Sequence, residues 1–481
     1  MGVAVGHHDV IVVSDLHLAA GVDPATGIYD PNEDFFAAGA LSRFLDHYLE
    51  RGRARDRRWR LVILGDFVDF LQVELPRELG AGLTSAEGSL ARLDIVAQGH
   101  PAVFAALRRW LEGGHRLEIV IGNHDIEFIW PAVQARLRRL VGAEEPALAA
   151  RVTFHPWVFY LPGILYAEHG HQYDAINSFL TPLAPYLPDD QRLIALPLGS
   201  FFVHYLFNAV ERVDPFADNV KPMTRYLGWA MRAHPVLTMT TLPAHLRLFL
   251  GAVRKTTPMT PAERHGRRER YRRTVLAPAA SAIGLPAATL DALDELAAVP
   301  TMTSPWEQFR ALTLKPVGPL AVGLAAAVGS ALGLGRLPAP GRSLRWPLLG
   351  LGFLVWREWP LLRPQREDRN GLREAAAAIH ELLTAVGWDE PPAQVPAYIF
   401  GHTHTAEQSP LGKEPAAPLY LNAGTWTPIV PSAFSLIGAR ELLSFVEVVQ
   451  DPETGMVRSS LLVWNDAAGR AEPLRRELAR G

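Results

Sequence analysis

The chain of 481 residues contains no cysteine, which excludes disulfide bonds, cysteine-ligated zinc and thiol catalysis. Histidine, carboxylate and amide side chains are then the remaining candidates for metal ligands. A large net charge is also absent, because the formal value at pH 7 is only -3. Bulk electrostatic capture of nucleic acid is therefore not predicted, and we expect no nucleic-acid partner. The length is sufficient for a large core and for two or three domains.

Long apolar runs are scarce, and the one candidate for a membrane segment is residues 317–335. Its 19 residues carry no charge, which is near the length needed to cross a bilayer. The arginines at 336, 342 and 345 follow it and disfavour a simple spanning hairpin. We predict membrane contact through residues 317–360, in an interfacial or re-entrant arrangement. The alternative is a buried helix pair, packed through Ala and Gly, in a soluble cap.

No signal peptide is visible, because the first apolar run, residues 10–13, leads directly into a polar motif. A cleaved leader would remove that motif. We therefore expect a cytoplasmic protein, associated with the inner face of the cell membrane if residues 317–360 contact lipid.

Five short polar motifs, each placed directly after a short apolar run, carry most of the chemical information. The runs are residues 10–13, 61–64, 117–121, 164–167 and 397–400, and their composition predicts buried strands. The motifs are Ser14-Asp15-Leu16-His17, Gly65-Asp66-Phe67-Val68-Asp69, Gly122-Asn123-His124-Asp125, Glu168-His169-Gly170-His171 and Gly401-His402-Thr403-His404. Ligands of α/β sheets bind beyond the carboxyl ends of the strands, so we expect the five motifs to meet there.

The residue types in these motifs favour a site for two divalent ions that acts on phosphoesters. Such a site needs one ligand shared by both ions, and Asp66 is the best candidate. Asp15 and His17 alternate along a segment that we expect to be extended, so that both side chains point the same way. The same arrangement is expected for His402 and His404. Mixed oxygen and imidazole ligands suit manganese, iron or zinc.

The five motifs together resemble the calcineurin-like metallophosphoesterase superfamily, over residues 8–174 and 396–465. The resemblance implies an α/β fold, a four-layered αββα sandwich, in which two metals and a bridging hydroxide hydrolyse a phosphoester. It further implies seven metal ligands and one catalytic histidine, His124, which protonates or stabilises the leaving oxygen. By the same resemblance the first metal is bound by Asp15, His17, Asp66 and His404, and the second by Asp66, Asn123, His169 and His402.

Two alternative functions remain open at this point. Ser-Asp-Leu-His-Leu and Leu-Gly-Asp-Phe resemble the UDP-2,3-diacylglucosamine pyrophosphohydrolase branch, which implies a lipid-linked substrate. This chain departs from that branch at His124 and Thr405, where the branch carries arginine. A non-catalytic scaffold is the third hypothesis. The sequence indicates neither the physiological substrate nor a preference for monoesters or diesters.

The spacing of the motifs predicts three segments: a first core part at 1–174, a mainly helical insertion or cap at 175–395, and a second core part at 396–481. Helices are predicted at residues 34–49 and 101–112, and a hairpin at 442–449 and 456–464. Six arginines lie between residues 263 and 273. We expect them to form a solvated helix face or a linker, with anionic lipid and then nucleic acid as the alternatives.

Three further motif residues are expected to support the site without binding metal. Asp69 is predicted to organise the second motif. Asp125 is predicted to hold a turn or to orient His124. His171 could contact substrate or form a hydrogen bond within the protein, and we favour the hydrogen bond.

Overall fold

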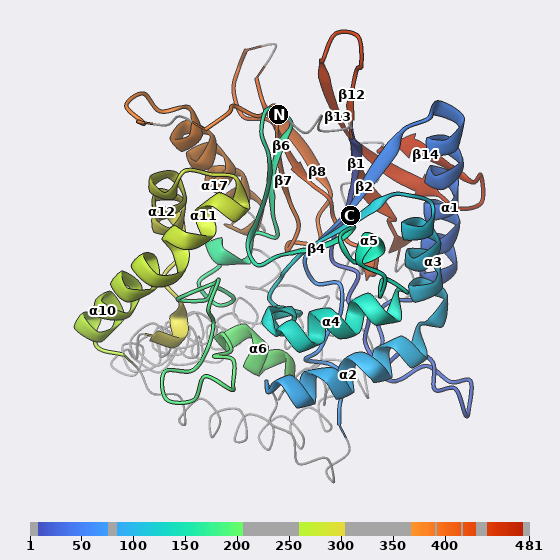
Figure 1. The fold of residues 1–481 in the computed structure, drawn as a ribbon, viewed down its shortest axis with the longest axis horizontal. Coiled ribbons are helices and arrows are strands. Elements are labelled where there is room, and N and C mark those ends of the chain that lie inside the picture. Colours follow the sequence, from blue (N-terminus) through green and yellow to red (C-terminus); the bar gives the residue numbers. More distant parts are fainter. Residues whose placement is uncertain are drawn as a thin grey trace, which may run out of the picture.

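A computed structural model of the chain describes residues 8–75, 84–204, 259–303, 367–389, 392–414, 417–429 and 440–474 (Figure 1). These residues form an α/β structure with two large mixed sheets. The segment 317–360, for which membrane contact is predicted, lies outside the described residues.

The first sheet contains seven strands in the order β14-β13-β12-β1-β2-β3-β4. Its first four strands along the chain are parallel, and β12 to β14 add to it in antiparallel pairs. The strands are β1 (His8–Val13), β2 (Arg58–Leu64), β3 (Arg116–Val120), β4 (Val152–His155), β12 (Ser444–Gln450), β13 (Val457–Asn465) and β14 (Arg470–Pro473). The predicted hairpin is confirmed, since β12 and β13 pair around a turn at residues 451–456.

The second sheet contains five strands in the order β5-β6-β7-β9-β8. Its central strands, β6, β7 and β9, are parallel. The strands are β5 (Val158–Leu161), β6 (Leu165–Glu168), β7 (Ala397–Phe400), β8 (Glu407–Pro410) and β9 (Leu419–Asn422). β6 and β7 pair directly although more than two hundred residues separate them in the chain, so the motif after β7 is brought beside the motif after β6.

The central strands β1, β2 and β3 of the first sheet bury both faces, because alternate side chains point in opposite directions and most of them are buried. Ile11 and Val13 of β1 pack in a cluster with residues of the surrounding helices. Val10 and Val12 pack against the second sheet, for example with Leu165. The helices of the first cluster are α1 (Ala38–Arg55), α2 (Ala86–Gly99), α3 (Pro101–Glu112) and α4 (Pro131–Leu140). The two sheets therefore share one hydrophobic core, with a helical layer on the outer face of the first.

The helix predicted at 101–112 is confirmed as α3, whereas the one predicted at 34–49 has different bounds. This helix, α1, begins at Ala38 because the side chain of Glu33 holds the backbone before it in a turn. The carboxylate of Glu33 accepts hydrogen bonds from the backbone N–H groups of Gly21 and Phe35. Such local bonds compete with a helix.

The outer face of the second sheet is covered by helices from the range predicted as an insertion. Tyr166 and Tyr398 of this sheet share a buried cluster with residues of these helices, such as Leu290 and Ile379. The helices are α11 (Ala277–Ile283), α12 (Ala287–Leu296) and α17 (Glu367–Thr384). Figure 1 shows them on one side of the strands, with α1 and α3 on the opposite side. Part of the range 175–395 thus packs directly on a sheet that carries the motifs.

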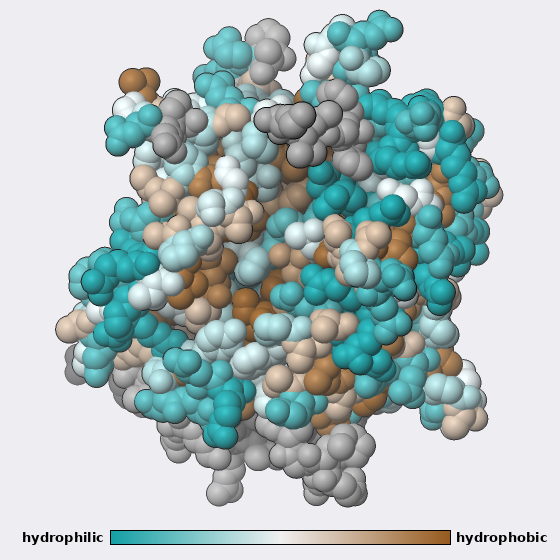
Figure 2. Space-filling view, viewed as in Figure 1, coloured by the Kyte–Doolittle hydropathy of each residue, from teal (hydrophilic) through white to brown (hydrophobic). Residues whose placement is uncertain are grey.

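The arginine-rich segment forms α10 (Pro261–Tyr271) and the π-helix that continues it, Arg272–Leu276. Arg268 pairs with the buried carboxylate of Asp294 at 2.6 Å, and Arg272 contacts Asp291 at 3.0 Å. Two more arginines, Arg264 and Arg267, donate hydrogen bonds to Thr303 and to the carbonyl of Tyr186. The surface over α10 is hydrophilic (Figure 2). Contacts within the protein therefore account for four of the six arginines.

Among the described residues, no single helix combines the length and apolar character needed to cross a membrane. One bent pair, residues 261–283 with Ala287–Leu296 at 112°, meets that criterion by length and composition only.

Candidate metal centre

The structure brings all five motifs together at the carboxyl ends of β1, β2, β3, β6 and β7. Asp15, His17 and His404 form one group of possible ligands, and the ligand atoms lie within 4.8 Å of one another. Asp66, His169 and His402 form a second group of the same size.

Asp66 connects the two groups. Its Oδ2 lies 3.0 Å from His169 Nε2 and 3.7 Å from His17 Nε2. Within the first group, Asp15 Oδ1 lies 3.3 Å from His404 Nε2. This arrangement is compatible with the predicted role of Asp66 as the ligand shared by two cations.

The seventh predicted ligand, Asn123, and two others carry buried atoms that lack hydrogen bonds. Within the described residues, Asp15 Oδ1, Asn123 Oδ1 and His169 Nε2 are buried and have no hydrogen-bond partner. An orphaned polar atom in a protein interior costs about 1–3 kcal/mol. A divalent cation satisfies such oxygen and imidazole donors, so the residues fit the predicted metals.

The backbone at this centre differs from the extended segments that the sequence predicted. Asp15 and His17 have φ values of 53° and 48°, in the left-handed region, so strand alternation does not set their directions. His402 and His404 are also left-handed, at 66° and 58°. Of the six non-glycine residues with positive φ in the described ranges, five are predicted ligands: Asp15, His17, Asp66, His402 and His404. Strained conformations of this kind concentrate at functional sites, where the surrounding structure enforces them.

The motif loops are fastened to one another by their own backbones. The N–H of His17 donates to the carbonyl of Asp66 at 2.8 Å. The N–H of His402 donates to Asp15 Oδ2 at 3.0 Å, and the N–H of Gly401 donates to the carbonyl of His169 at 3.0 Å. Thr425, in the turn after β9, also donates to the carbonyl of Asp15. Each loop therefore positions ligands of another loop.

Gly122 is required for the close approach of two of these loops. A Cβ at this position would lie 2.2 Å from Asp66 Oδ1 and 2.6 Å from the backbone nitrogen of Asp66. We predict that Gly122→Ala displaces Asp66 and weakens metal binding by about 10- to 100-fold, the usual effect of disturbing the support of a ligand. Titration of the metal-free protein with manganese measures this effect.

Gly371 in α17 provides the matched control, because a Cβ there meets no atom within 4 Å. Gly371→Ala is expected to keep metal affinity and to gain about 0.5–1 kcal/mol in stability. Equal metal affinity in both alanine variants would contradict the steric role of Gly122.

Asp69 orients two histidines through one carboxylate oxygen. Its Oδ2 lies 2.9 Å from His17 Nδ1 and 2.6 Å from His124 Nδ1. Its Oδ1 accepts backbone hydrogen bonds from Leu71 and Gln72. Since Nδ1 is occupied in both rings, Nε2 is the nitrogen that faces the centre. Asp69 therefore holds the backbone that follows the second motif, and its reach to His17 and His124 was not foreseen.

Asp125 has the first of the two roles predicted for it, because it holds a turn. Its carboxylate accepts hydrogen bonds from the backbone N–H groups of Gly122 and Phe67. Asp125 therefore joins the second and third motifs and holds a turn, while Asp69 is the carboxylate that contacts His124. Asp125 directly follows His124 in the sequence. The fold nevertheless places Asp69, from the loop after β2, against the His124 ring.

Electrostatics at the centre favour positive charge. Burial opposes the charged form of His169, yet the carboxylates of Asp66 and Asp15 raise the pKa of its imidazole to about 9. Burial likewise opposes charge on His17, but the nearby carboxylates of Asp15 and Asp69 raise its pKa well above the ordinary value. Cations that bind here displace these protons, so metal binding is expected to release protons.

His171 follows the prediction of a hydrogen bond within the protein. Its Nε2 lies 2.9 Å from Nε2 of Gln172, and the Oε1 of that glutamine accepts the N–H of Phe179. The pKa of His171 lies well below the ordinary value because the ring is buried and because His169 and His402 are nearby. His171 is therefore a neutral neighbour of the ligands.

Glu127, two residues after the third motif, is a buried carboxyl that sequence reasoning missed. Burial raises its pKa to about 8 from an ordinary value of 4.5. Because the folded pKa exceeds the unfolded one, the folded state loses stability as pH rises from about 4.5 to about 8. We predict that Glu127→Gln is more stable than the unchanged protein at pH 9 by about 1–3 kcal/mol, with a smaller difference at pH 5.5.

Urea unfolding at the two pH values measures this difference. The exposed Glu453→Gln is the control for replacing a glutamate with glutamine. A Glu127→Gln advantage that is the same at both pH values would contradict the titration of Glu127.

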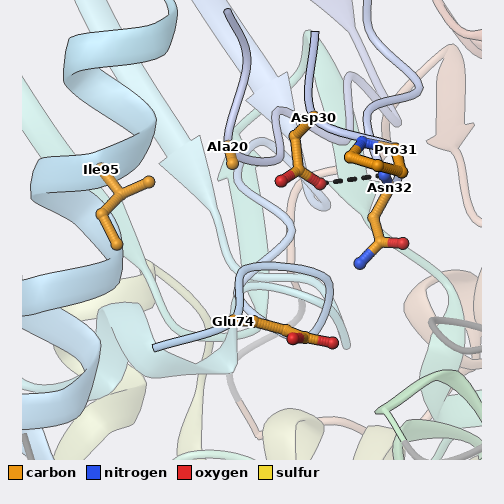
Figure 3. Close-up of a pocket in the computed structure, with 6 residues that line it drawn as sticks. All are labelled: Ala20, Asp30, Pro31, Asn32, Glu74 and Ile95. Atoms are coloured by element: carbon orange, nitrogen blue, oxygen red, sulfur yellow. Dashed lines mark hydrogen bonds between the residues drawn. The ribbon is translucent and has the colours of Figure 1, made fainter. Parts of the chain in front are cut away.

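A separate cavity of about 350 Å³ opens beside the loop that precedes α1 (Figure 3). Asp30, Asn32 and Glu74 supply its polar lining, and Asp30 accepts a hydrogen bond from the backbone N–H of Asn32. None of the predicted metal ligands or His124 lines this cavity.

No protein-family model and no curated protein matches this chain. The chemical interpretation of the centre therefore depends on its residues and their geometry.

Proposed function

We propose that the protein is a phosphoester hydrolase with a dinuclear metal centre. One observation carries this proposal: two groups of ligands meet at Asp66, and the buried atoms Asp15 Oδ1, Asn123 Oδ1 and His169 Nε2 have no hydrogen-bond partner in the described structure. Two adjacent cations would satisfy these atoms. When bound, such a pair holds a phosphoryl group and generates a nucleophile from water near neutral pH.

His124 is the group that we assign to the leaving oxygen. Asp69 holds its Nδ1, and 13% of the side chain is exposed, compared with 4% for His17. Burial opposes a proton on His124, but the charges of Asp69 and Asp66 raise its pKa above the ordinary value. A protonated imidazole at the open side of the centre can donate its Nε2 proton to a departing alkoxide.

We further propose that the chain is a member of the calcineurin-like metallophosphoesterase superfamily with a four-layered αββα sandwich. Two sheets that share a core support this proposal, since helices cover the outer face of each. The order of the five motifs along the chain supports it as well.

The test uses the full-length chain, stripped with a chelator and reloaded with manganese, zinc or iron. We expect two metals per chain and hydrolysis of chromogenic phosphomonoesters or phosphodiesters that depends on added metal. A parallel assay with a UDP-linked lipid distinguishes the lipid-linked pyrophosphohydrolase. Binding of two metals without cleavage of any of these substrates would favour the non-catalytic scaffold, and absence of metal binding would overturn the proposal.

A further inference from the structure

The carboxylate of Asp174 reaches the metal centre although it lies outside the five motifs. Its Oδ2 lies 3.3 Å from Nε2 of His402. The Asp174 side chain is 40% exposed, whereas that of His402 is 9% exposed. A ring nitrogen that faces a carboxylate is not available to a metal at the same time. The contact between Nε2 and Asp174 therefore sets the orientation of the His402 ring, which belongs to the second group of possible ligands.

Both oxygens of this carboxylate are held in place by the residues that follow it. Oδ1 accepts the backbone N–H of Ile176 at 3.0 Å, and Oδ2 accepts Nδ2 of Asn177 at 2.7 Å. Asn177 in turn packs against α6 (Leu198–Phe202), where a Cβ on Gly199 would lie 1.9 Å from its Oδ1. The carboxylate is thus preorganised, as the outer partner of a metal-binding histidine needs to be.

The segment that carries Asp174 is also fastened to the chain that follows α12. The N–H of Ala298 donates to the carbonyl of Gln172, and the N–H of Thr301 donates to the carbonyl of Ala175, both at 2.8 Å. Residues from the helical part of the chain therefore fix the position from which Asp174 meets His402.

We propose that Asp174 is a positioning residue that orients His402 for the second metal ion. The inference depends on the two-metal part of the proposed function and does not depend on phosphoester hydrolysis. It predicts that Asp174→Ala weakens the binding of one cation by about 10- to 100-fold, the usual effect of removing such an outer partner, and leaves the other cation in place.

The experiment titrates manganese into the metal-free full-length protein by calorimetry and follows the spin-coupled manganese pair by electron paramagnetic resonance. Asp174→Asn is the conservative variant, because its amide oxygen can still accept the hydrogen bond from His402. We expect it to keep both metals and the coupled signal. Asp190→Ala is the matched control, because Asp190 is also a partly exposed carboxylate, 32% exposed, and it pairs with Arg192 outside the five motifs.

Each outcome either supports or overturns the positioning role of Asp174. Selective loss of one manganese in Asp174→Ala, with both retained in Asp174→Asn and Asp190→Ala, supports the positioning role. Equal loss in Asp174→Ala and Asp174→Asn would make Asp174 a direct ligand and overturn that role. If Asp174→Ala bound both manganese ions with unchanged affinity, the positioning role would be overturned and the dinuclear centre would remain supported. Absence of two metals in the unchanged protein would overturn both this inference and the proposed function.

Discussion

Replacing Asp66 with alanine is expected to abolish binding of the metal pair and to lower phosphoester turnover by on the order of 10³-fold, the rate equivalent of several kcal/mol of metal stabilisation. Oδ2 of Asp66 lies between His17 and His169, so both groups of ligands lose the same oxygen. Oδ1 also accepts the backbone N–H of His124. The variant therefore removes the shared ligand and loosens the third motif.

Metal analysis of the reloaded variant measures the first effect, and a chromogenic phosphoester assay measures the second. Asp56→Ala is a matched control, because Asp56 is the one other non-glycine residue in the described structure with a positive φ, 48°, and it lies at the end of α1. Both variants place alanine in the left-handed region, where the strain costs about 1–2 kcal/mol. Only Asp66→Ala should lose metal. Two manganese ions per chain in that variant would contradict a shared ligand.

Replacing His124 with alanine is expected to lower turnover by about 10²- to 10⁴-fold, the range for a general acid, while both metals remain bound. Its Nδ1 is held by Asp69, so Nε2 is free to face a leaving oxygen. The loss should be smaller for esters of acidic phenols than for esters of simple alcohols, because a stable phenolate needs no proton when it departs. Rates measured across such a series give the dependence on the leaving group.

His155→Ala is the control for this variant, since His155 also contacts a carboxylate, Glu118 Oε2 at 3.0 Å, but lies outside the motifs. It should keep both turnover and metal. His124 also forms a group with His17 and Asp66 that could hold a cation. If His124→Ala lost metal to the same extent as Asp66→Ala, His124 would be a metal ligand, and its assignment as general acid would be wrong.

Local patterns in the sequence were sufficient for the strands that carry the motifs. Short β-branched runs predicted β1, β2, β3, β6 and β7, because a strand buried on both faces excludes polar residues from its interior. The motif residues then followed directly at the strand ends, and the structure groups six of the seven predicted ligands into two clusters. The helix α1 was less well predicted, because Glu33 uses its carboxylate to hold a turn that no periodicity reveals.

The sequence by itself determined which residue types are present and that they follow buried strands, since composition and periodicity are local properties. The tertiary structure alone decided which of them meet. His17 and His404 are 387 positions apart and lie 3.1 Å from each other through their Nε2 atoms. It also decided that Asp69 and not Asp125 contacts His124, that five of the seven predicted ligands adopt left-handed backbones, and that Asp174 faces His402. These outcomes depend on strand order and on packing between distant segments, which short stretches of sequence do not encode.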